Sequence, residues 1–134
     1  MPILLDTSFI IAFDNVKDIH HKKARDLWSK IENMEHGLYF ISDYIFDEII
    51  AVSMRKTDKN STIHLGQKLL NSIPLITIDN LTFNDTWKLF KETKENLSFT
   101  DCTNLVLLKL MSSKKIATFD KGFNDIKDVE LINN

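Results

Sequence analysis

The chain has little of several features that mark whole classes of protein. Among its 134 residues there is one cysteine, Cys102, with three glycines and two prolines. A single cysteine excludes a disulfide framework and a zinc site built from several cysteines, and it is typical of a reducing compartment. No apolar run approaches the ~18 residues that a membrane helix needs, and no basic segment precedes an apolar stretch at the start. We therefore expect no membrane anchor, no signal peptide and a cytoplasmic location.

The chain also lacks a strong excess of either charge. Its 17 Lys and Arg and 19 Asp and Glu give a formal net charge of -2 at pH 7. Proteins that hold nucleic acid by bulk electrostatics are usually strongly basic, so this balance argues against that mode of binding. Short basic clusters occur at Arg55-Lys56 and Lys114-Lys115, but solvated helix faces explain them equally well. The charge neither excludes nor indicates a nucleic-acid substrate.

Apolar residues are plentiful and regularly arranged. The hydrophobic fraction is 43%, with nine Phe, so a chain of this length can bury a core as one domain, residues 1–134. Helical patterns alternate with short apolar strands, which we predict at 3–5, 38–41, 75–78, 116–119 and 129–132. This alternation predicts a parallel sheet that helices cover on both faces, with ligands bound beyond the carboxyl ends of the strands.

The positions of several aromatic and histidine side chains indicate structural roles. In the helix that follows residue 79, the spacing of Phe83, Trp87 and Phe90 predicts that these rings face inward. We interpret His20 and His21 as surface residues, because adjacent side chains on a helix point apart.

Four of the 19 acidic residues lie in unusual settings. Two end apolar strands, one lies within the apolar helical segment 45–50, and one begins an otherwise apolar helix: Asp6, Asp120, Glu48 and Asp101, respectively. Each has a simpler explanation by itself. Asp6 can cap the following helix, Asp101 can complete a capping box with Ser98, and Glu48 can face solvent beside Asp47. The four together make a functional site plausible.

Carboxylates that converge in one site need a cation. Two unit charges ~4 Å apart repel by about 4 kcal/mol at an effective dielectric constant near 20, so several bare carboxylates would strain the fold. Oxygen ligands select a hard divalent ion, Mg²⁺ or Mn²⁺. Such an ion can activate water and stabilise the charge that develops on a phosphodiester under attack.

The order and spacing of four segments resemble those of the PIN-domain ribonucleases. The segments are Leu5-Asp6-Thr7-Ser8, the helical Glu48, Ser98-Phe99-Thr100-Asp101 and Ala117-Thr118-Phe119-Asp120-Lys121-Gly122-Phe123. The similarity extends over essentially the whole chain and is closest to the VapC-type toxins of toxin–antitoxin modules. It implies a three-layer α/β/α sandwich with a central, mainly parallel sheet, and metal-dependent endonucleolytic cleavage of RNA.

The resemblance also implies roles for particular residues and partners. Asp6, Glu48, Asp101 and Asp120 match the acids that bind Mg²⁺ or Mn²⁺ and carry catalysis in the family. The resemblance implies supporting roles for the hydroxyl residues beside these acids, Thr7, Ser8 and Thr118. The family further suggests a homodimer, a cognate antitoxin and an RNA substrate.

Other classes of protein also place acids at strand ends. A haloacid-type phosphotransferase needs a second Asp two residues after the first, where this chain has Ser8. A receiver-type regulatory module needs an acidic pair after the first strand, and Asp6-Thr7 does not supply it. The alternative that stays open is a catalytically silent PIN-like or receiver-type binding module.

Overall fold

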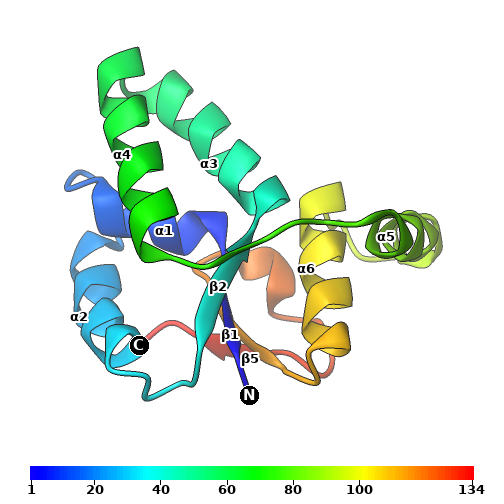
Figure 1. The fold of residues 1–134 in the computed structure, drawn as a ribbon. Helices are drawn as coiled ribbons and strands as arrows, with labels where there is room; N and C mark the ends of the chain where they lie inside the picture. Colours follow the sequence, from blue (N-terminus) through cyan, green and yellow to red (C-terminus); the bar gives the residue numbers. More distant parts are fainter.

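The computed structural model describes residues 1–134 and alternates strands with helices along the chain (Figure 1). The strands are β1 (Ile3–Leu5), β2 (Tyr39–Ser42), β3 (Leu75–Ile76), β4 (Lys115–Ala117) and β5 (Glu130–Ile132). The helices are α1 (Thr7–Asp14), α2 (His21–Glu32), α3 (Asp43–Lys56), α4 (Lys59–Ser72), α5 (Asn80–Glu92) and α6 (Phe99–Leu110), with a 3-10 turn η1 (Lys121–Phe123).

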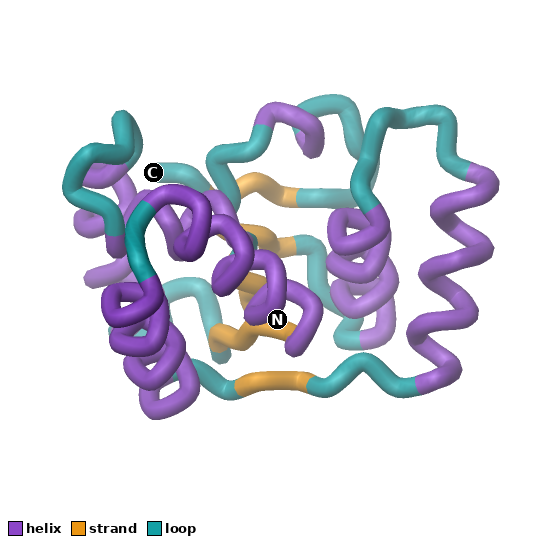
Figure 2. Tube along the Cα trace, turned by 90° about the horizontal axis from the view of Figure 1, so that it is seen from above, coloured by secondary structure: helices purple, strands orange, loops and turns teal.

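The five strands form one parallel sheet in the order β3-β2-β1-β4-β5. The central strand is β1, in which Leu4 lies opposite Phe40 of β2 and Ile116 of β4. Figure 2 shows the strands in the middle of the molecule with helices on both sides. The predicted helix–sheet–helix sandwich with a parallel sheet is therefore confirmed.

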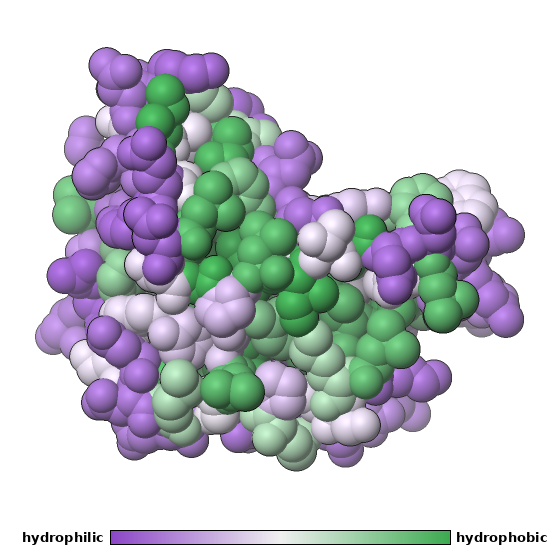
Figure 3. Space-filling model, viewed as in Figure 1, coloured by the Kyte–Doolittle hydropathy of each residue, from purple (hydrophilic) through white to green (hydrophobic).

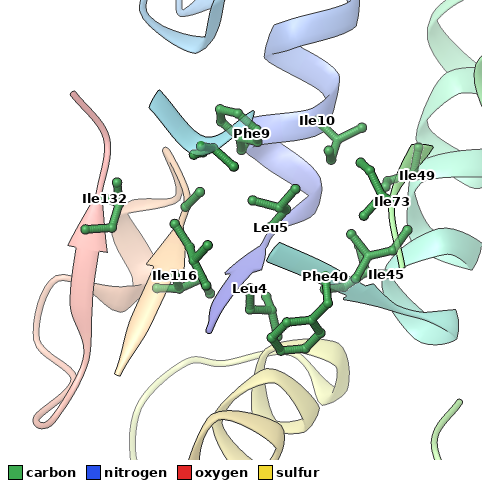
Figure 4. Close-up of a cluster of buried hydrophobic side chains, with 14 of the residues drawn as sticks. Leu4, Leu5, Phe9, Ile10, Phe40, Ile45, Ile49, Ile73, Ile116 and Ile132 are labelled. Atoms are coloured by element: carbon green, nitrogen blue, oxygen red, sulfur yellow. The ribbon is translucent and has the colours of Figure 1, made fainter. Parts of the chain in front are cut away.

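The core explains why the first strand is an uninterrupted apolar run. All three residues of β1 are fully buried, because helices cover both faces of the strand. Leu4 and Leu5 lie in the middle of the cluster in Figure 4, between Ile116 of β4 and Ile45 of α3. This rigid centre fixes the position of the residue that follows β1, Asp6.

Two strands, β3 and β4, end earlier than the sequence predicts, for the same physical reason. The backbone amide of Ile78 donates to Asp43 Oδ1 at 3.0 Å, and that of Phe119 donates to Ser8 Oγ at 2.9 Å. Because these amides bind side chains, they are not available to a neighbouring strand. The strands β3 and β4 thus end early, and the residues after them form loops.

The orientation predicted for α5 is wrong. The side chains of Phe83, Trp87 and Phe90 are 45%, 49% and 39% exposed, whereas Thr82 and Thr86 are the buried residues of this helix. Figure 1 shows α5 beside α6 and away from the sheet. Since α5 does not reach the main core, its rings pack instead near Phe99 at the start of α6, with Phe83 at a centroid distance of 5.5 Å.

An apolar surface results from this placement. Figure 3 shows hydrophobic side chains gathered on the face that lies between α4 and α5. The exposed residues of these two helices and of the edge strand β3 include Leu70, Leu75, Phe83 and Trp87. None of the helices is long and apolar enough to cross a membrane.

Candidate active site

The four singled-out acids line one pocket at the carboxyl edge of the sheet. Asp6 follows β1 and Asp120 follows β4, while Glu48 lies in α3 and Asp101 in the first turn of α6. Their pocket has a volume of about 480 Å³. The structure thus brings together all four residues, which are separated by more than a hundred positions in the sequence.

Asp6 is the most deeply buried of the four, with 3% of its surface exposed. Its Oδ2 accepts a hydrogen bond from Thr118 Oγ1 at 2.7 Å, and its Oδ1 accepts a longer one from Asn104 Nδ2 at 3.4 Å. Its side chain makes no capping hydrogen bond to α1. The capping explanation therefore does not account for Asp6, whose carboxylate is held by Thr118, directly after β4, and by Asn104 of α6.

A chain of hydroxyl groups connects Asp6 to the loop after β4. Thr118 gives its one proton to Asp6, so the 3.0 Å contact between Ser8 Oγ and Thr118 Oγ1 requires Ser8 to donate. Ser8 in turn accepts the backbone N–H of Phe119, and Thr118 accepts that of Asp120 at 3.0 Å. These two hydroxyls fix both the Asp6 carboxylate and the backbone that carries Asp120.

The third hydroxyl residue, Thr7, is placed differently. Its Oγ1 is buried and has no hydrogen-bond partner within 3.5 Å. It nevertheless lies near enough to Glu48 to oppose the upward shift of that residue's pKa. An unpartnered buried hydroxyl is uncommon in native proteins, so this group points to a ligand or water in the pocket.

Asp101 and Asp120 are anchored to backbone through one carboxylate oxygen each. Asp101 Oδ2 accepts the Ser98 backbone N–H at 3.0 Å, while Ser98 Oγ accepts that of Asp101, which is the predicted capping box. Asp120 Oδ1 accepts the N–H of Gly122 at 2.8 Å. Because each acid keeps a second oxygen with no hydrogen bond, capping and a role in the pocket are compatible for Asp101.

The pocket disfavours negative charge in the absence of a cation. Burial raises the pKa of Asp6 from its ordinary 3.8 to about 7, and the charges of Asp101 and Glu48 add to the effect. The pKa of Glu48 and that of Asp101 are also raised, first by burial and then by neighbouring carboxylates. The ion pairs of the structure are Lys68–Asp14 and Lys114–Asp128, so none of the four acids has one.

The donor set fits a hard divalent ion. It consists of carboxylate oxygens with hydroxyls nearby, which are ligands that Mg²⁺ and Mn²⁺ prefer. In this arrangement no three acidic, histidine or cysteine side chains are close enough together to hold an ion directly. This spacing still suits Mg²⁺, because that ion usually takes one or two carboxylates and keeps several waters.

Sequence reasoning missed Asn104, whose side chain is fully buried and donates to Asp6. Its Oδ1 has no hydrogen-bond partner. The signal was present, because Asn104 is three residues after Asp101 and therefore shares its helix face. A polar residue within an apolar helix is expected to have a buried partner.

Three residues for which the sequence predicts ordinary surface positions line the pocket: His20, Arg55 and Lys56. Phe119, predicted as the last residue of an apolar strand, lines it too. The interpretation of His20 as a surface residue is incomplete, since its ring stacks on Phe119. No spacing rule connects residues 20, 55 and 119, so only the folded chain reveals this wall.

Comparisons with known proteins agree with this fold. The family model for the PIN domain matches residues 3–129 of this chain. The VapC20 toxin of Mycobacterium tuberculosis, which cleaves the sarcin–ricin loop, has a similar structure, with a TM-score of 0.87 and 20% sequence identity. The match covers 98% of this chain and 99% of that one. No curated protein matches in sequence.

Two further solved structures have the same fold. VapBC2 from Rickettsia felis, bound to a DNA fragment from its promoter, gives a TM-score of 0.73 at 14% identity over 100% of this chain and 99% of that one. A toxin–antitoxin complex from Klebsiella pneumoniae gives a TM-score of 0.63 at 18% identity. The match covers 96% of this chain and 95% of that one.

Proposed function

Because this chain belongs to the PIN-domain family, we propose that it is a divalent-metal-dependent endoribonuclease and the toxin of a toxin–antitoxin module. The resemblance found in the sequence is confirmed at the level of the family. The observation that carries the proposal is that four carboxylates share one pocket and that none of them forms an ion pair with a basic side chain. The fold likeness to VapC toxins supports the nuclease, and nothing supports the alternative of a silent or receiver-type binding module.

In this proposal Asp6, Glu48, Asp101 and Asp120 form the site that would hold Mg²⁺ or Mn²⁺, with one or two of them as direct ligands and the others acting through water. When bound, the ion supplies a Lewis acid that activates water and neutralises charge on the phosphodiester. The chain positions Asp6, Asp101 and Asp120 beforehand through hydrogen bonds to Thr118 and to backbone N–H groups, which limits the reorganisation needed for reaction. No side-chain nucleophile is required.

The remaining hydroxyl residues have supporting roles in the same proposal. Ser8 keeps the proton of Thr118 directed at Asp6, because Ser8 itself donates to Thr118. Thr7 offers an unpartnered hydroxyl beside Glu48, where it can orient a water or the carboxylate. The chain forms a single PIN-like domain over residues 1–134 and acts in the cytoplasm, where RNA is found.

The partners follow from the relatives and from the surface. Structural relatives include toxin–antitoxin complexes, which supports a cognate antitoxin for this chain. The exposed apolar face between α4 and α5 supports a homodimer, because surfaces of this kind are usually covered by another protein. Co-purification with the product of the adjoining reading frame tests the first partner, and light scattering of the purified chain tests the second.

The cleavage assay that tests the function compares matched variants on total RNA and on short RNA oligonucleotides. The wild type is expected to cut RNA with Mg²⁺ or Mn²⁺ and to lose activity in EDTA. Asp101→Asn and Glu48→Gln are expected to lose at least about a hundredfold in rate, since each removes a charge that the metal site needs. Asp47→Asn is the control, because Asp47 is exposed, adjoins Glu48 and lies outside the pocket.

Circular dichroism establishes that the variants are folded before their rates are compared. Equal cleavage by wild type, Asp101→Asn and Glu48→Gln would contradict the proposal. Loss of activity in Asp47→Asn as large as in Glu48→Gln would show that the assay reports helix stability instead of the site.

A further inference from the structure

One wall of the acidic pocket is an aromatic stack. The imidazole of His20 lies on the ring of Phe119 with a centroid distance of 4.5 Å and an angle of 4° between the planes. Phe119 also stacks on Phe9 of the core at 6.3 Å. His20 and Phe119 are only partly buried, and both line the pocket that contains the four acids.

The stack is held in place by the chain around it. The backbone N–H of His20 donates to Asp18 Oδ1 at 2.8 Å, and the next residue, His21, contacts Ala12 O through Nδ1 at 2.8 Å. The backbone of Phe119 is bound to Ser8, which belongs to the hydroxyl chain at Asp6. The backbone at both residues is therefore held near the acids, and the two rings support each other by stacking, which is suitable for a binding platform.

Basic side chains line the same pocket at the end of α3. Arg55 and Lys56 are exposed and have no ion pair with an acidic side chain. Arg55 acts on the pKa of Glu48, which it lowers against the effect of burial. The pocket thus combines flat aromatic surface, carboxylates and free cations in about 480 Å³, a volume typical of ligand sites.

We propose that the His20–Phe119 stack is a subsite for one unpaired nucleobase of the RNA, next to the phosphodiester that is cut, with Arg55 and Lys56 contacting a neighbouring phosphate. This inference rests on the proposed ribonuclease function. A base stacks on an aromatic face whatever its identity, whereas in an A-form duplex the bases already stack on one another. The enzyme should accordingly prefer loops and single strands to duplex RNA.

The carboxylates make this division of roles necessary. Carboxylates without a bound cation repel the RNA backbone, so attractive contacts elsewhere in the same pocket favour binding of the substrate. Stacking contributes about 1–3 kcal/mol per base, which corresponds to a change of about 5- to 150-fold in affinity. Loss of the platform should hence weaken RNA binding without removing the metal site.

The test is an abasic scan of one cleaved RNA oligonucleotide. Each version lacks the base at one position, and its affinity is measured by fluorescence anisotropy with Ca²⁺ in place of Mg²⁺ to slow cleavage. For the wild type, one position beside the cut is expected to lose about 5- to 150-fold in affinity when its base is removed. His20→Ala should bind the intact RNA as weakly as the wild type binds the RNA that lacks this base. Removal of the base at the same position should then leave the affinity of His20→Ala unchanged.

Two further variants distinguish stacking from structural effects. His20→Tyr keeps a flat ring and is expected to retain the sensitive position, whereas His64→Ala, on the exposed side of α4, should match the wild type throughout. A wild type with no sensitive position, or an unchanged scan in His20→Ala, overturns the platform. A separate cleavage assay in Mg²⁺ decides the ribonuclease function, so each can fail without the other.

Discussion

The charge of Asp6 should destabilise the folded protein above neutral pH when no metal is present. In the folded state burial raises the pKa of this carboxyl to about 7, whereas in the unfolded chain its pKa is near the ordinary 3.8. The stability that comes from the raised pKa is fully present below about pH 4 and is lost as the pH rises to 7. The difference of about three between the folded and the unfolded pKa corresponds to about 4 kcal/mol of unfolding free energy, which is an upper value.

Replacement of Asp6 by Asn removes the charge and keeps the shape. Thr118 can still donate to the side-chain oxygen, and Asn104 can turn its amide so that its unpartnered Oδ1 accepts from the new Nδ2. In EDTA, Asp6→Asn should equal the wild type near pH 4. Near pH 8 its free energy of unfolding should be higher by about 2–4 kcal/mol.

Urea denaturation in EDTA at the two pH values measures this difference, with Asp47→Asn as a control that should show no such change. Addition of Mg²⁺ near pH 8 should stabilise the wild type more than Asp6→Asn, because the ion neutralises the charge that the variant lacks. An Asp6→Asn variant that is less stable than the wild type at both pH values would refute the reasoning.

Three other predictions follow from the contacts. Thr118→Val removes the 2.7 Å hydrogen bond to Asp6 and should reduce metal affinity by about 10- to 100-fold, measured by calorimetry with the fold checked by circular dichroism. Leu5→Ala opens a cavity in a fully buried position and should cost about 2–5 kcal/mol of unfolding free energy in urea titrations. Trp87→Lys replaces a half-exposed apolar ring of α5 with a charge and should convert the proposed dimer to a monomer in light scattering, while it leaves the fold intact.

Most of the architecture could be predicted from local patterns in the sequence. The run at Ile3–Leu5 and the helix spacing reflect burial, which is the main force that forms these elements. The capping box at Ser98 and Asp101 depends only on neighbours three residues apart, so sequence suffices to find it. The orientation of α5 could not be found in this way, because it depends on how far that helix lies from the sheet.

The candidate site was predictable in part for similar reasons. Parallel strands end at one edge, so Asp6 and Asp120 were expected to lie near each other. The contacts of Asn104 with Asp6, and of His20 with Phe119, join residues about a hundred positions apart. Helical spacing places Asn104 on the same face as Asp101, but which residues these side chains contact follows from the packing of whole elements.

The central claim is that the shared pocket of carboxylates binds a divalent cation. Titration of the metal-free protein with Mn²⁺, followed by electron paramagnetic resonance of the free ion, measures this directly and does not depend on the RNA. The wild type and Asp47→Asn should bind Mn²⁺ equally, and Glu48→Gln and Asp101→Asn should each bind it at least about tenfold more weakly. Equal binding by all four proteins, or no binding by the wild type, would contradict the account.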